Sequence, residues 1–254
     1  MKYVRLINDS CENALSQVED NSVQLIYLDP PYGTSHIHWD VPLDWEKLWP
    51  ELWRVLKPSG VILIHSMMPQ TAHIISQHPE DFKYTWVWNR GTHSCFLNSK
   101  YQPLRVCEDI CIFYKAPAIY NPQTVVGNRT VKAGPSSSKY YHQSYTTGET
   151  RHYTCRQPKN ILDFKSERGK LKPYALIDFL IRTYTNMGDM VLDPCMHTGN
   201  VGIRCSTLGR RFTGIEKDSF IFKEAEERLA ESRGRSFSAP CCRSSCQTAF
   251  SLVP

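Results

Sequence analysis

An apolar run from Val23 to Leu28, broken only by Gln24, is the feature that most constrains the fold of this chain. A strand that does not alternate between apolar and polar residues is buried on both faces, as in parallel sheets covered by helices on either side. The sequence Asp-Pro-Pro-Tyr (29–32) follows directly, and its prolines end the strand because they fix the backbone and lack N–H donors. The run therefore predicts a buried parallel strand with polar groups at its carboxyl end.

The same four residues suit the binding of an exocyclic amine. The Asp29 carboxylate and the Pro30 carbonyl remain as hydrogen-bond acceptors, and an amino group between them can donate both of its hydrogens. Tyr32 offers an aromatic face on which a planar base can stack. A strand end followed by a stiff turn explains the same residues without a site, so the tetrapeptide favours a binding role but does not settle it.

Strands and helices alternate along most of the chain, which is typical of a mostly parallel sheet with helices on both faces. We expect strands over residues 2–7, 23–28, 61–65, 84–89, 109–114, 190–192 and 212–215. We expect helices over residues 11–18, 43–56, 69–77, 173–184, 199–208 and 218–230. The helix over 43–56 carries an apolar stripe that predicts core packing, and Pro50 is expected to kink it or to begin a second helix.

Regular periodicity is lost over residues 116–165, which include the flexible sequence Gly-Pro-Ser-Ser-Ser (134–138). Since 254 residues correspond to one large domain, we interpret this stretch as an insertion that serves recognition. The end of the chain, residues 233–254, is rich in Ser, Arg and Cys and is predicted to be disordered.

The net charge of +5 is unevenly distributed. Residues 1–82 contain 5 Lys and Arg against 11 Asp and Glu, whereas residues 83–172 contain 15 against 5. Tyrosines are interleaved with the basic residues of this middle segment, and that combination suits a polyanion that carries bases. A solvated surface region is the alternative, and the charge pattern favours nucleic acid.

Composition argues against several other classes of protein. No apolar stretch of 18 residues exists, so no membrane span is expected, and residues 1–8 lack the apolar region of a signal peptide. The ten cysteines show no paired C-x-x-C spacing, so we interpret them as thiols and predict neither disulfides nor a metal site. We therefore expect a cytoplasmic protein.

The second half of the chain contains a pattern that suits a nucleoside. The strand over 190–192 ends at Asp193, a turn with Gly199 leads into a helix, and the next strand ends at Glu216 about twenty residues further on. In α/β sheets such a turn approaches the ligand, and the acid accepts hydrogen bonds from ribose hydroxyls. Taken alone the signal is weak, because Glu216 also fits a surface position at a strand end.

Six stretches in one order resemble the amino-DNA methyltransferases that use S-adenosylmethionine, and most of all a phage and prophage group of N6-adenine methyltransferases. The resemblance extends from Tyr3 to Leu229. Its stretches are DPPYGTSHIHWD (29–40), RVLKPSGVILI (54–64), WVWNRGTHSCFLNSKYQPLR (86–105), IFYKAPAIYNPQ (112–123), FLIRTYTNMGDMVLDPCMHTGNVG (179–202) and GRRFTGIEKD (209–218).

The resemblance implies a Rossmann-like α/β methyltransferase fold whose motif order is circularly permuted. Residues 1–115 and 166–232 would form the catalytic domain, with the cofactor-binding part in the second range, and residues 116–165 would be the target-recognition insertion. Double-stranded DNA is the implied partner, in a bacterial or phage-infected cell and in the context of restriction-modification. A homodimer is left open.

The resemblance also assigns roles to residues. Asp29 and the Pro30 carbonyl would hold the target amine, with Pro31 completing the turn, and Tyr32 would stack on a base flipped from the duplex. The implied cofactor pocket comprises Asp9 facing the adenine, Lys172 and Pro173 at the start of a lining helix, Asp193 beside the methionine part, Pro194, Cys195, His197, Gly199 and Asn200 in the turn, and Glu216 on the ribose. The expected DNA contacts are Arg90, Asn98, Lys100, Arg105, Arg129, Lys132 and Lys139.

No nucleophilic side chain and no metal are needed for this chemistry, because a sulfonium methyl group already has a good leaving group. Catalysis would then rest on positioning and on acceptors that enrich the lone pair of the amine. An alternative role for Asp9 is to cap the helix that begins near Cys11.

Two departures from the family pattern stand out. His197 occupies a position that is usually glycine, and the sequence Arg-Gly-Lys-Leu (168–171) replaces the usual His-Pro-Thr-Gln before Lys172. The alternatives to adenine methylation are N4-cytosine methylation, a DNA-binding protein with a decayed site, and methylation of RNA or of a protein glutamine. The cytosine enzymes more often have Ser in place of Asp29, which favours adenine.

Overall fold

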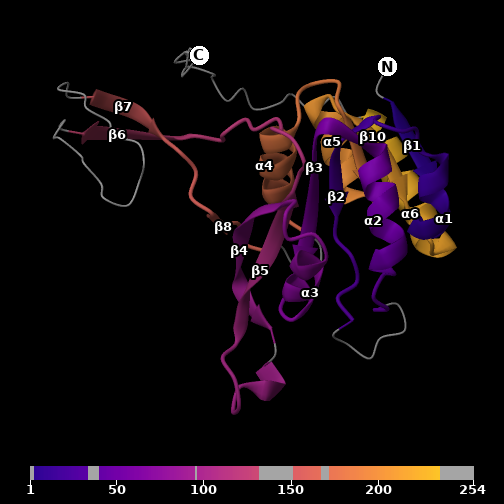
Figure 1. The fold of residues 1–254 in the computed structure, drawn as a ribbon, viewed down its shortest axis with the longest axis horizontal. Helices are drawn as coiled ribbons and strands as arrows, with labels where there is room; N and C mark the ends of the chain where they lie inside the picture. The colour runs from indigo at the N-terminus through magenta and orange to yellow at the C-terminus, as the bar shows by residue number, and fades with distance from the viewer. Residues whose placement is uncertain (1–2, 34–39, 95, 132–150, 167–171, 235–254) are drawn as a thin grey trace. The chain divides into compact units, whose positions relative to one another are not determined.

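A computed structural model describes residues 3–33, 40–94, 96–131, 151–166 and 172–234 of the chain. Eight strands form one sheet in the order β1-β10-β9-β2-β3-β5-β4-β8 (Figure 1). These strands are β1 (Val4–Ile7), β2 (Val23–Leu28), β3 (Leu56–Ser66), β4 (Phe82–Ser94), β5 (Arg105–Phe113), β8 (Ile161–Asp163), β9 (Met190–Asp193) and β10 (Arg211–Ile215). All neighbours are parallel except β5, which is antiparallel to both β3 and β4.

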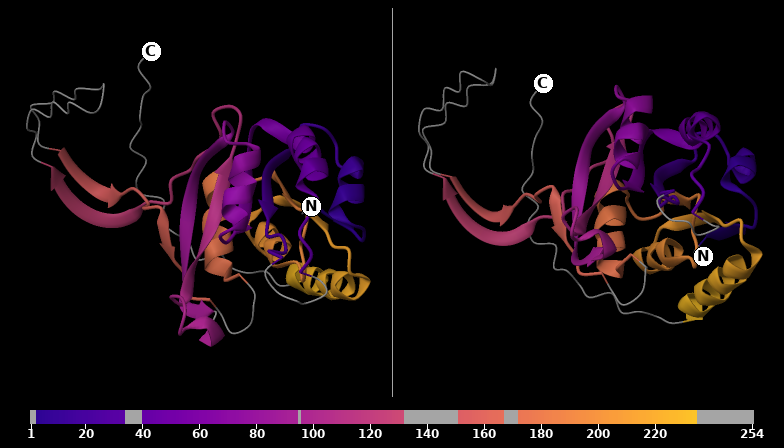
Figure 2. Two further views of the ribbon diagram at one scale, coloured as in Figure 1. Left: turned by 60° about the horizontal axis from the view of Figure 1, so that its bottom comes forward. Right: turned by 90° about the horizontal axis from the view of Figure 1, so that it is seen from below.

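Helices cover both faces of this sheet (Figure 2). The helical segments are α1 (Cys11–Ala14), η1 (Leu15–Gln17), α2 (Trp45–Val55), α3 (Gln70–Gln77), η2 (Phe96–Asn98), α4 (Tyr174–Tyr184), α5 (Asn200–Leu208) and α6 (Ser219–Gly234). Leu25 and Tyr27 of β2 pack in the core with α4, α5 and α6, whereas Ile26 and Leu28 pack in a second core with α1 and α2. The central strand is thus buried on both faces, and the predicted fold class, an α/β fold with a mostly parallel sheet, is confirmed.

Helix α2 continues through Pro50 without a second helix beginning there. The buried side of α2 carries Trp45, Leu48 and Leu52, whereas Pro50 lies on the exposed side. Apolar burial along one stripe holds the helix together, although the proline removes one main-chain hydrogen bond.

The prediction that residues 116–165 are irregular is wrong for part of that stretch. Strands β6 (Val125–Val131) and β7 (Arg151–Arg156) pair antiparallel within a separate compact unit, Pro122–Lys159. Strand β8 joins the main sheet beside β4. The register of β6 shifts between Val126 and Arg129, and such a shift removes the two-residue alternation that marks a strand in sequence.

The predicted end of the catalytic domain also differs. Helix α6 extends to Gly234, two residues into the segment predicted to be disordered, and residues 235–254 lie outside the described residues. Within the described ranges, no helix is both long and apolar enough to cross a membrane.

Gly202 allows α5 to lie close to β10, and we expect Gly202→Ala to destabilise the protein. A Cβ at this position would lie 2.5 Å from Phe212 Cε1 and 3.0 Å from Leu229 Cδ2. Overpacking of this kind lowers the free energy of unfolding by about 1–3 kcal/mol. Urea denaturation measures the change, and the further substitution Phe212→Leu should recover part of it.

Thr207→Ala is the matched control, because Thr207 lies in the same helix but is only half-buried. It should lower the free energy of unfolding by less than Gly202→Ala does. A Gly202→Ala variant as stable as the wild type would contradict the close contact.

Candidate active site

Four parallel strands bring polar residues to one edge of the sheet, its carboxyl edge. β2 ends just before Asp29, β3 ends at Ser66, β9 ends at Asp193 and β10 ends just before Glu216. Ligands of such sheets bind outside the carboxyl ends of the strands. The parts of the chain from which a site was predicted therefore meet at the position where this fold binds its ligands.

The turn after β2 is tied to its surroundings on both sides. The Gln70 side chain of α3 donates from Nε2 to the Pro31 carbonyl at 3.2 Å. The Gly33 main-chain N–H donates to Asp40 Oδ1 at 2.8 Å. Asp29, at the start of this turn, keeps a side chain that is 34% exposed. Asp29 is thus held at the surface, where a ligand can reach it.

An ion cluster joins Asp29 to two residues from distant parts of the chain. The Lys172 ammonium donates to Asp29 Oδ1 at 3.1 Å and also to the Glu108 carboxylate. The Tyr32 hydroxyl lies 3.1 Å from Asp29 Oδ1, makes a hydrogen bond with Glu108 and accepts from Lys172 at 3.3 Å. The three ammonium hydrogens therefore have three acceptors. We call these four residues the Lys172 cluster.

The charges of the Lys172 cluster stabilise one another in a site with little water. Burial by itself would lower the pKa of Lys172, but Asp29 and Glu108 outweigh it and hold that pKa above its ordinary value. Burial, followed by the same two carboxylates, raises the pKa of Tyr32 well above its ordinary value. Lys172 is therefore a cation and Tyr32 a neutral hydroxyl over the physiological pH range.

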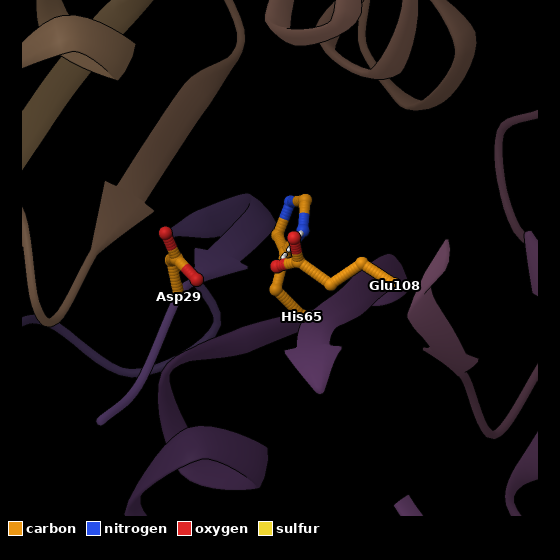
Figure 3. Close-up of side chains that lie close together, drawn as sticks. All are labelled: Asp29, His65 and Glu108. Carbon is orange, nitrogen blue, oxygen red and sulfur yellow. Dashed lines mark ion pairs between the residues drawn. The ribbon is translucent and has the colours of Figure 1, made fainter. Parts of the chain in front are cut away.

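His65 lies next to the cluster, deep in the sheet. Figure 3 shows its imidazole beside the Glu108 carboxylate, with His65 Nδ1 3.8 Å from Glu108 Oε1. His65 Nε2 is 2.8 Å from the Tyr27 hydroxyl, whereas Nδ1 has no hydrogen-bond partner in the described part of the chain. Burial, and after it Lys172, lowers the pKa of His65 well below its ordinary value. The imidazole is therefore neutral.

Asp29, His65 and Glu108 also lie close enough together to hold a metal ion (Figure 3). The Lys172 ammonium, however, already contacts both carboxylates. A cation that is part of the protein thus balances their charge, and the arrangement fits an ion pair better than a metal site.

A second group of residues follows β9 and forms the turn into α5. The buried Asp193 carboxylate accepts from the Cys195 main-chain N–H at 3.1 Å. His197 has φ +48°, in the left-handed region, and Gly199 has φ +77°. Non-glycine residues rarely adopt that region, which explains why a turn of this shape favours glycine at position 197.

Glu216 supports the same turn from the neighbouring strand. Its carboxylate accepts from the His197 main-chain N–H at 3.0 Å and from that of Asp218 at 2.9 Å. A carboxylate can accept about four hydrogen bonds, so Glu216 can still accept hydrogen bonds from the hydroxyl groups of a ligand.

Three carboxylates converge between the two groups. Burial raises the pKa of Asp193 well above its ordinary value, the hydrogen bond from Cys195 opposes this, and the charges of Asp29 and Glu216 add to the increase. β9, which ends at Asp193, lies between β2 and β10, so Asp193 has Asp29 on one side and Glu216 on the other. Such a site attracts a cationic ligand.

The other predicted cofactor residues serve the local structure in different ways. Asp9 accepts from the Ser10 main-chain N–H at 2.7 Å and from the Asn13 side chain at 3.2 Å. The N-cap of α1 is Ser10, so Asp9 does not cap this helix itself. Asn200 accepts from Arg228 at 2.7 Å. The buried Pro194 and the half-buried Cys195 lie in the turn, and Pro173 directly precedes α4.

The predicted DNA contacts belong to different parts of the chain. Arg90 lies in β4 and donates to the main-chain carbonyls of Arg105 and Val106, at 3.1 and 3.4 Å, so it braces the β4–β5 hairpin. Asn98 and Lys100 are exposed at the tip of that hairpin. Arg129 lies in β6 of the separate unit, and Lys132 and Lys139 lie outside the described residues.

Glu108 and His65 were not among the predicted site residues. Glu108 was missed because the strand was predicted to begin at Asp109, four residues too late, so that Glu108 fell just outside it. His65 was placed as the last residue of a buried strand. β5 begins at Arg105, so Glu108 is a buried carboxylate within a strand. A charged residue inside an apolar strand is rarely buried without a partner, and that rule would have singled out Glu108.

Comparison with known proteins agrees with this geometry. Residues 23–227 match the N6_N4_Mtase family, described as DNA methylase. The type II methyltransferase M.HpaI of Haemophilus parainfluenzae is 28% identical over 245 residues, which cover 89% of this chain and 74% of that protein. The DNA adenine methyltransferase YhdJ of Escherichia coli is 27% identical over 236 residues, covering 85% of this chain and 79% of the relative.

Solved structures share the fold. A putative DNA modification methylase from Thermus thermophilus, complexed with S-adenosyl-L-methionine, matches with a TM-score of 0.60 and 22% identity over 90% of this chain and 93% of that one. The cytosine-N4-specific PvuII DNA methyltransferase matches with a TM-score of 0.59 and 13% identity, over 92% and 93%. Since the family match extends over most of the chain, from β2 to α6, this chain belongs to the DNA methylase family.

Proposed function

We propose that this protein transfers a methyl group from S-adenosylmethionine to the N6 amino group of an adenine flipped out of duplex DNA. The observation that carries the proposal is the Asp29 carboxylate, held at the carboxyl end of β2 by Tyr32 and Lys172. The proteins similar to this chain include type II methyltransferases and a DNA adenine methyltransferase. Restriction-modification in a bacterial or phage-infected cell is the proposed setting, and the phage-type group with permuted motif order remains the proposed subfamily.

The geometry of Asp29 suits an amine. Its Oδ1 atom is used by Tyr32 and Lys172, whereas Oδ2 has no hydrogen-bond partner among the described residues. Oδ2 and the Pro30 carbonyl can therefore accept the two hydrogens of the target amine. As the nitrogen gains positive charge, the carboxylate stabilises that charge without having to reorient, because the Lys172 cluster holds it in place.

The residues at the carboxyl edge also fit the cofactor. S-adenosylmethionine carries a sulfonium and an ammonium group, and it supplies the electrophilic methyl group when bound. Asp193 and Glu216 provide negative charge beside the turn, and Glu216 has lone pairs left for the ribose hydroxyls. Because β9 and β2 are adjacent strands, the turn that joins β9 to α5 lies next to Asp29.

Cytosine-N4 methylation is the second candidate, because both targets are exocyclic amines and the PvuII cytosine enzyme has this fold. Asp29, rather than the Ser usual in cytosine enzymes, favours adenine. A decayed, purely DNA-binding protein is disfavoured because Asp29, Tyr32, Asp193 and Glu216 are all present and lie at or just after the ends of the adjacent strands β2, β9 and β10. We assign target recognition to residues 116–165, which contain the separate unit with β6 and β7.

Product analysis tests the proposal. We expect the protein, incubated with labelled S-adenosylmethionine and unmethylated plasmid DNA, to yield labelled N6-methyladenine after digestion to nucleosides. Asp29→Ala should lower the rate by two or more orders of magnitude, the loss expected for a main transition-state acceptor, with DNA binding retained. Asp20→Ala, which removes an exposed carboxylate before β2, is the control and should stay within twofold.

Labelled N4-methylcytosine would establish the cytosine alternative instead. DNA binding without any labelled nucleoside would support the decayed site, and an Asp29→Ala rate within threefold of wild type would remove Asp29 from the mechanism.

Glu108 is expected to act as a positioning residue through Lys172. In Glu108→Gln the ammonium loses one of its two carboxylate partners, and the free energy of unfolding should fall by about 1.5–3 kcal/mol. The methylation rate should fall about tenfold, since Asp29 is then held less firmly. Adding Lys172→Met should restore most of the stability but not the rate, because it removes the unpaired charge while Asp29 loses its support.

Single-turnover rates and urea denaturation separate the two effects, and the exposed Glu46→Gln serves as the control. Recovery of both rate and stability in the double variant would show that Glu108 matters only for folding.

Position 197 should limit cofactor affinity. His197→Gly replaces a residue held at φ +48° by one that adopts this conformation freely, so calorimetric titration should show tighter binding of S-adenosylmethionine, by about threefold. Glu216→Ala is the opposite control and should weaken binding at least about tenfold, because it removes a charge-assisted acceptor. If His197→Gly and the wild type bind S-adenosylmethionine with equal affinity, the histidine has no effect on cofactor binding.

A further inference from the structure

We propose that the tip of the β4–β5 hairpin is a DNA wedge, whose exposed apolar side chains enter the base stack and keep the flipped base from returning. The proposal rests on the proposed function, DNA methylation of a flipped base. It concerns Leu97 and Tyr101, which none of the roles described above involves.

The tip exposes apolar groups to an unusual degree. Phe96 is 68% exposed, Leu97 is 92% exposed and Tyr101 is 89% exposed. They lie on and just after the short helix η2, whose turn is held by hydrogen bonds from the main-chain N–H groups of Ser99 to Phe96 and of Tyr101 to Asn98, at 3.0 and 2.9 Å. Scattered single apolar residues on a surface need no explanation, but neighbouring ones on a protruding tip mark a contact site.

The stalk that carries the tip is braced. The Arg90 guanidinium bonds the Ser94 hydroxyl at 2.9 Å and the Arg105 carbonyl at 3.1 Å, and so it links the two strands where they leave the sheet. Ser166, next to the hairpin, donates from its main-chain N–H to the Arg90 carbonyl at 2.9 Å. Because the two strands are linked in this way, the tip can enter a base stack while the strands that carry it keep their conformation.

The hairpin projects from the same edge of the sheet as the site. Glu108 of the Lys172 cluster and Arg105 at the base of the tip belong to one strand, β5, and three residues of strand span about 10 Å. Figure 1 shows β4 and β5 running on past the other strands, with η2 at their end. A duplex whose flipped base reaches Asp29 therefore lies within reach of the tip.

Charge identifies nucleic acid as the partner. Residues 89–107 contain three basic residues, Arg90, Lys100 and Arg105, and no Asp or Glu. Lys100 is exposed beside Tyr101, where it can contact a phosphate while the ring contacts bases. Proteins that open base stacks insert leucine and aromatic side chains in this way, and the wedge compensates for the stacking lost when a base leaves.

The test compares two DNA substrates. Methylated positions in a plasmid are first mapped with the wild-type protein, and a 30-base-pair duplex carrying one such site is made in two forms, fully paired and lacking the base opposite the target. We expect Leu97→Ser combined with Tyr101→Ser to slow single-turnover methylation about tenfold on the paired duplex, the order of one lost base–aromatic stack. On the second duplex, where flipping costs little, the loss should shrink to within twofold.

The control is Met187→Ala, which removes an exposed side chain before β9, away from the carboxyl edge, and should change neither rate. An equal loss on both duplexes, or no loss on either, would overturn the wedge. A dimer of the wild type that the double variant converts to monomers would make the tip an interface between copies, and would overturn it as well. If the wild-type protein methylates no plasmid DNA, the proposed function fails, and the wedge fails with it.

Discussion

The buried ammonium of Lys172 is the point on which the arrangement of the site depends. Lys172 lies two residues before α4, yet it contacts Asp29 after β2 and Glu108 within β5, so one cation links three elements that are far apart in the sequence. Removing one member of this cluster leaves a buried charge without its partner, which destabilises the fold. The burial of the lysine therefore depends on both carboxylates, and Glu108 in turn depends on the lysine. The position of Asp29, from which the chemistry follows, is fixed by the same requirement.

Parallel strand pairing explains how the two halves of the site meet. β9 and β2 are direct neighbours, with Val191 beside Leu25 and Leu192 beside Ile26, so the turns that follow them are neighbours as well. Because adjacency in the sheet does not depend on the order of the strands along the chain, the half that contains Asp29 can precede the half that contains Asp193. A shared site requires only that the carboxyl ends of β2 and β9 lie at the same edge of the sheet.

The sequence was sufficient to predict the strands and helices whose apolar residues follow a regular pattern. The run from Val23 to Leu28 predicted a strand buried on both faces, and its flanking Asp29 was correctly placed at the strand end. Glu108 could not be found in this way, because its significance lies in a partner 64 positions further along the chain. Strand β6 escaped detection for a local reason, since its irregular register removes the alternation on which strand prediction relies. In this chain, contacts between residues distant in sequence and irregular strand pairing leave no periodic pattern in the sequence.

The residues that flank the separate unit Pro122–Lys159, Asn121 and Asn160, belong to the main body and are held there by main-chain hydrogen bonds. The Asn121 main-chain N–H bonds the Thr183 carbonyl at 2.7 Å, and the Asn160 carbonyl accepts from Val87 at 2.8 Å. Both ends are thus held by backbone groups, whose bonding is indifferent to the side chains in between. Recombination between related genes at these two positions would exchange the intervening segment as a cassette and leave the main sheet intact, so this segment can change by shuffling as well as by gradual point mutation.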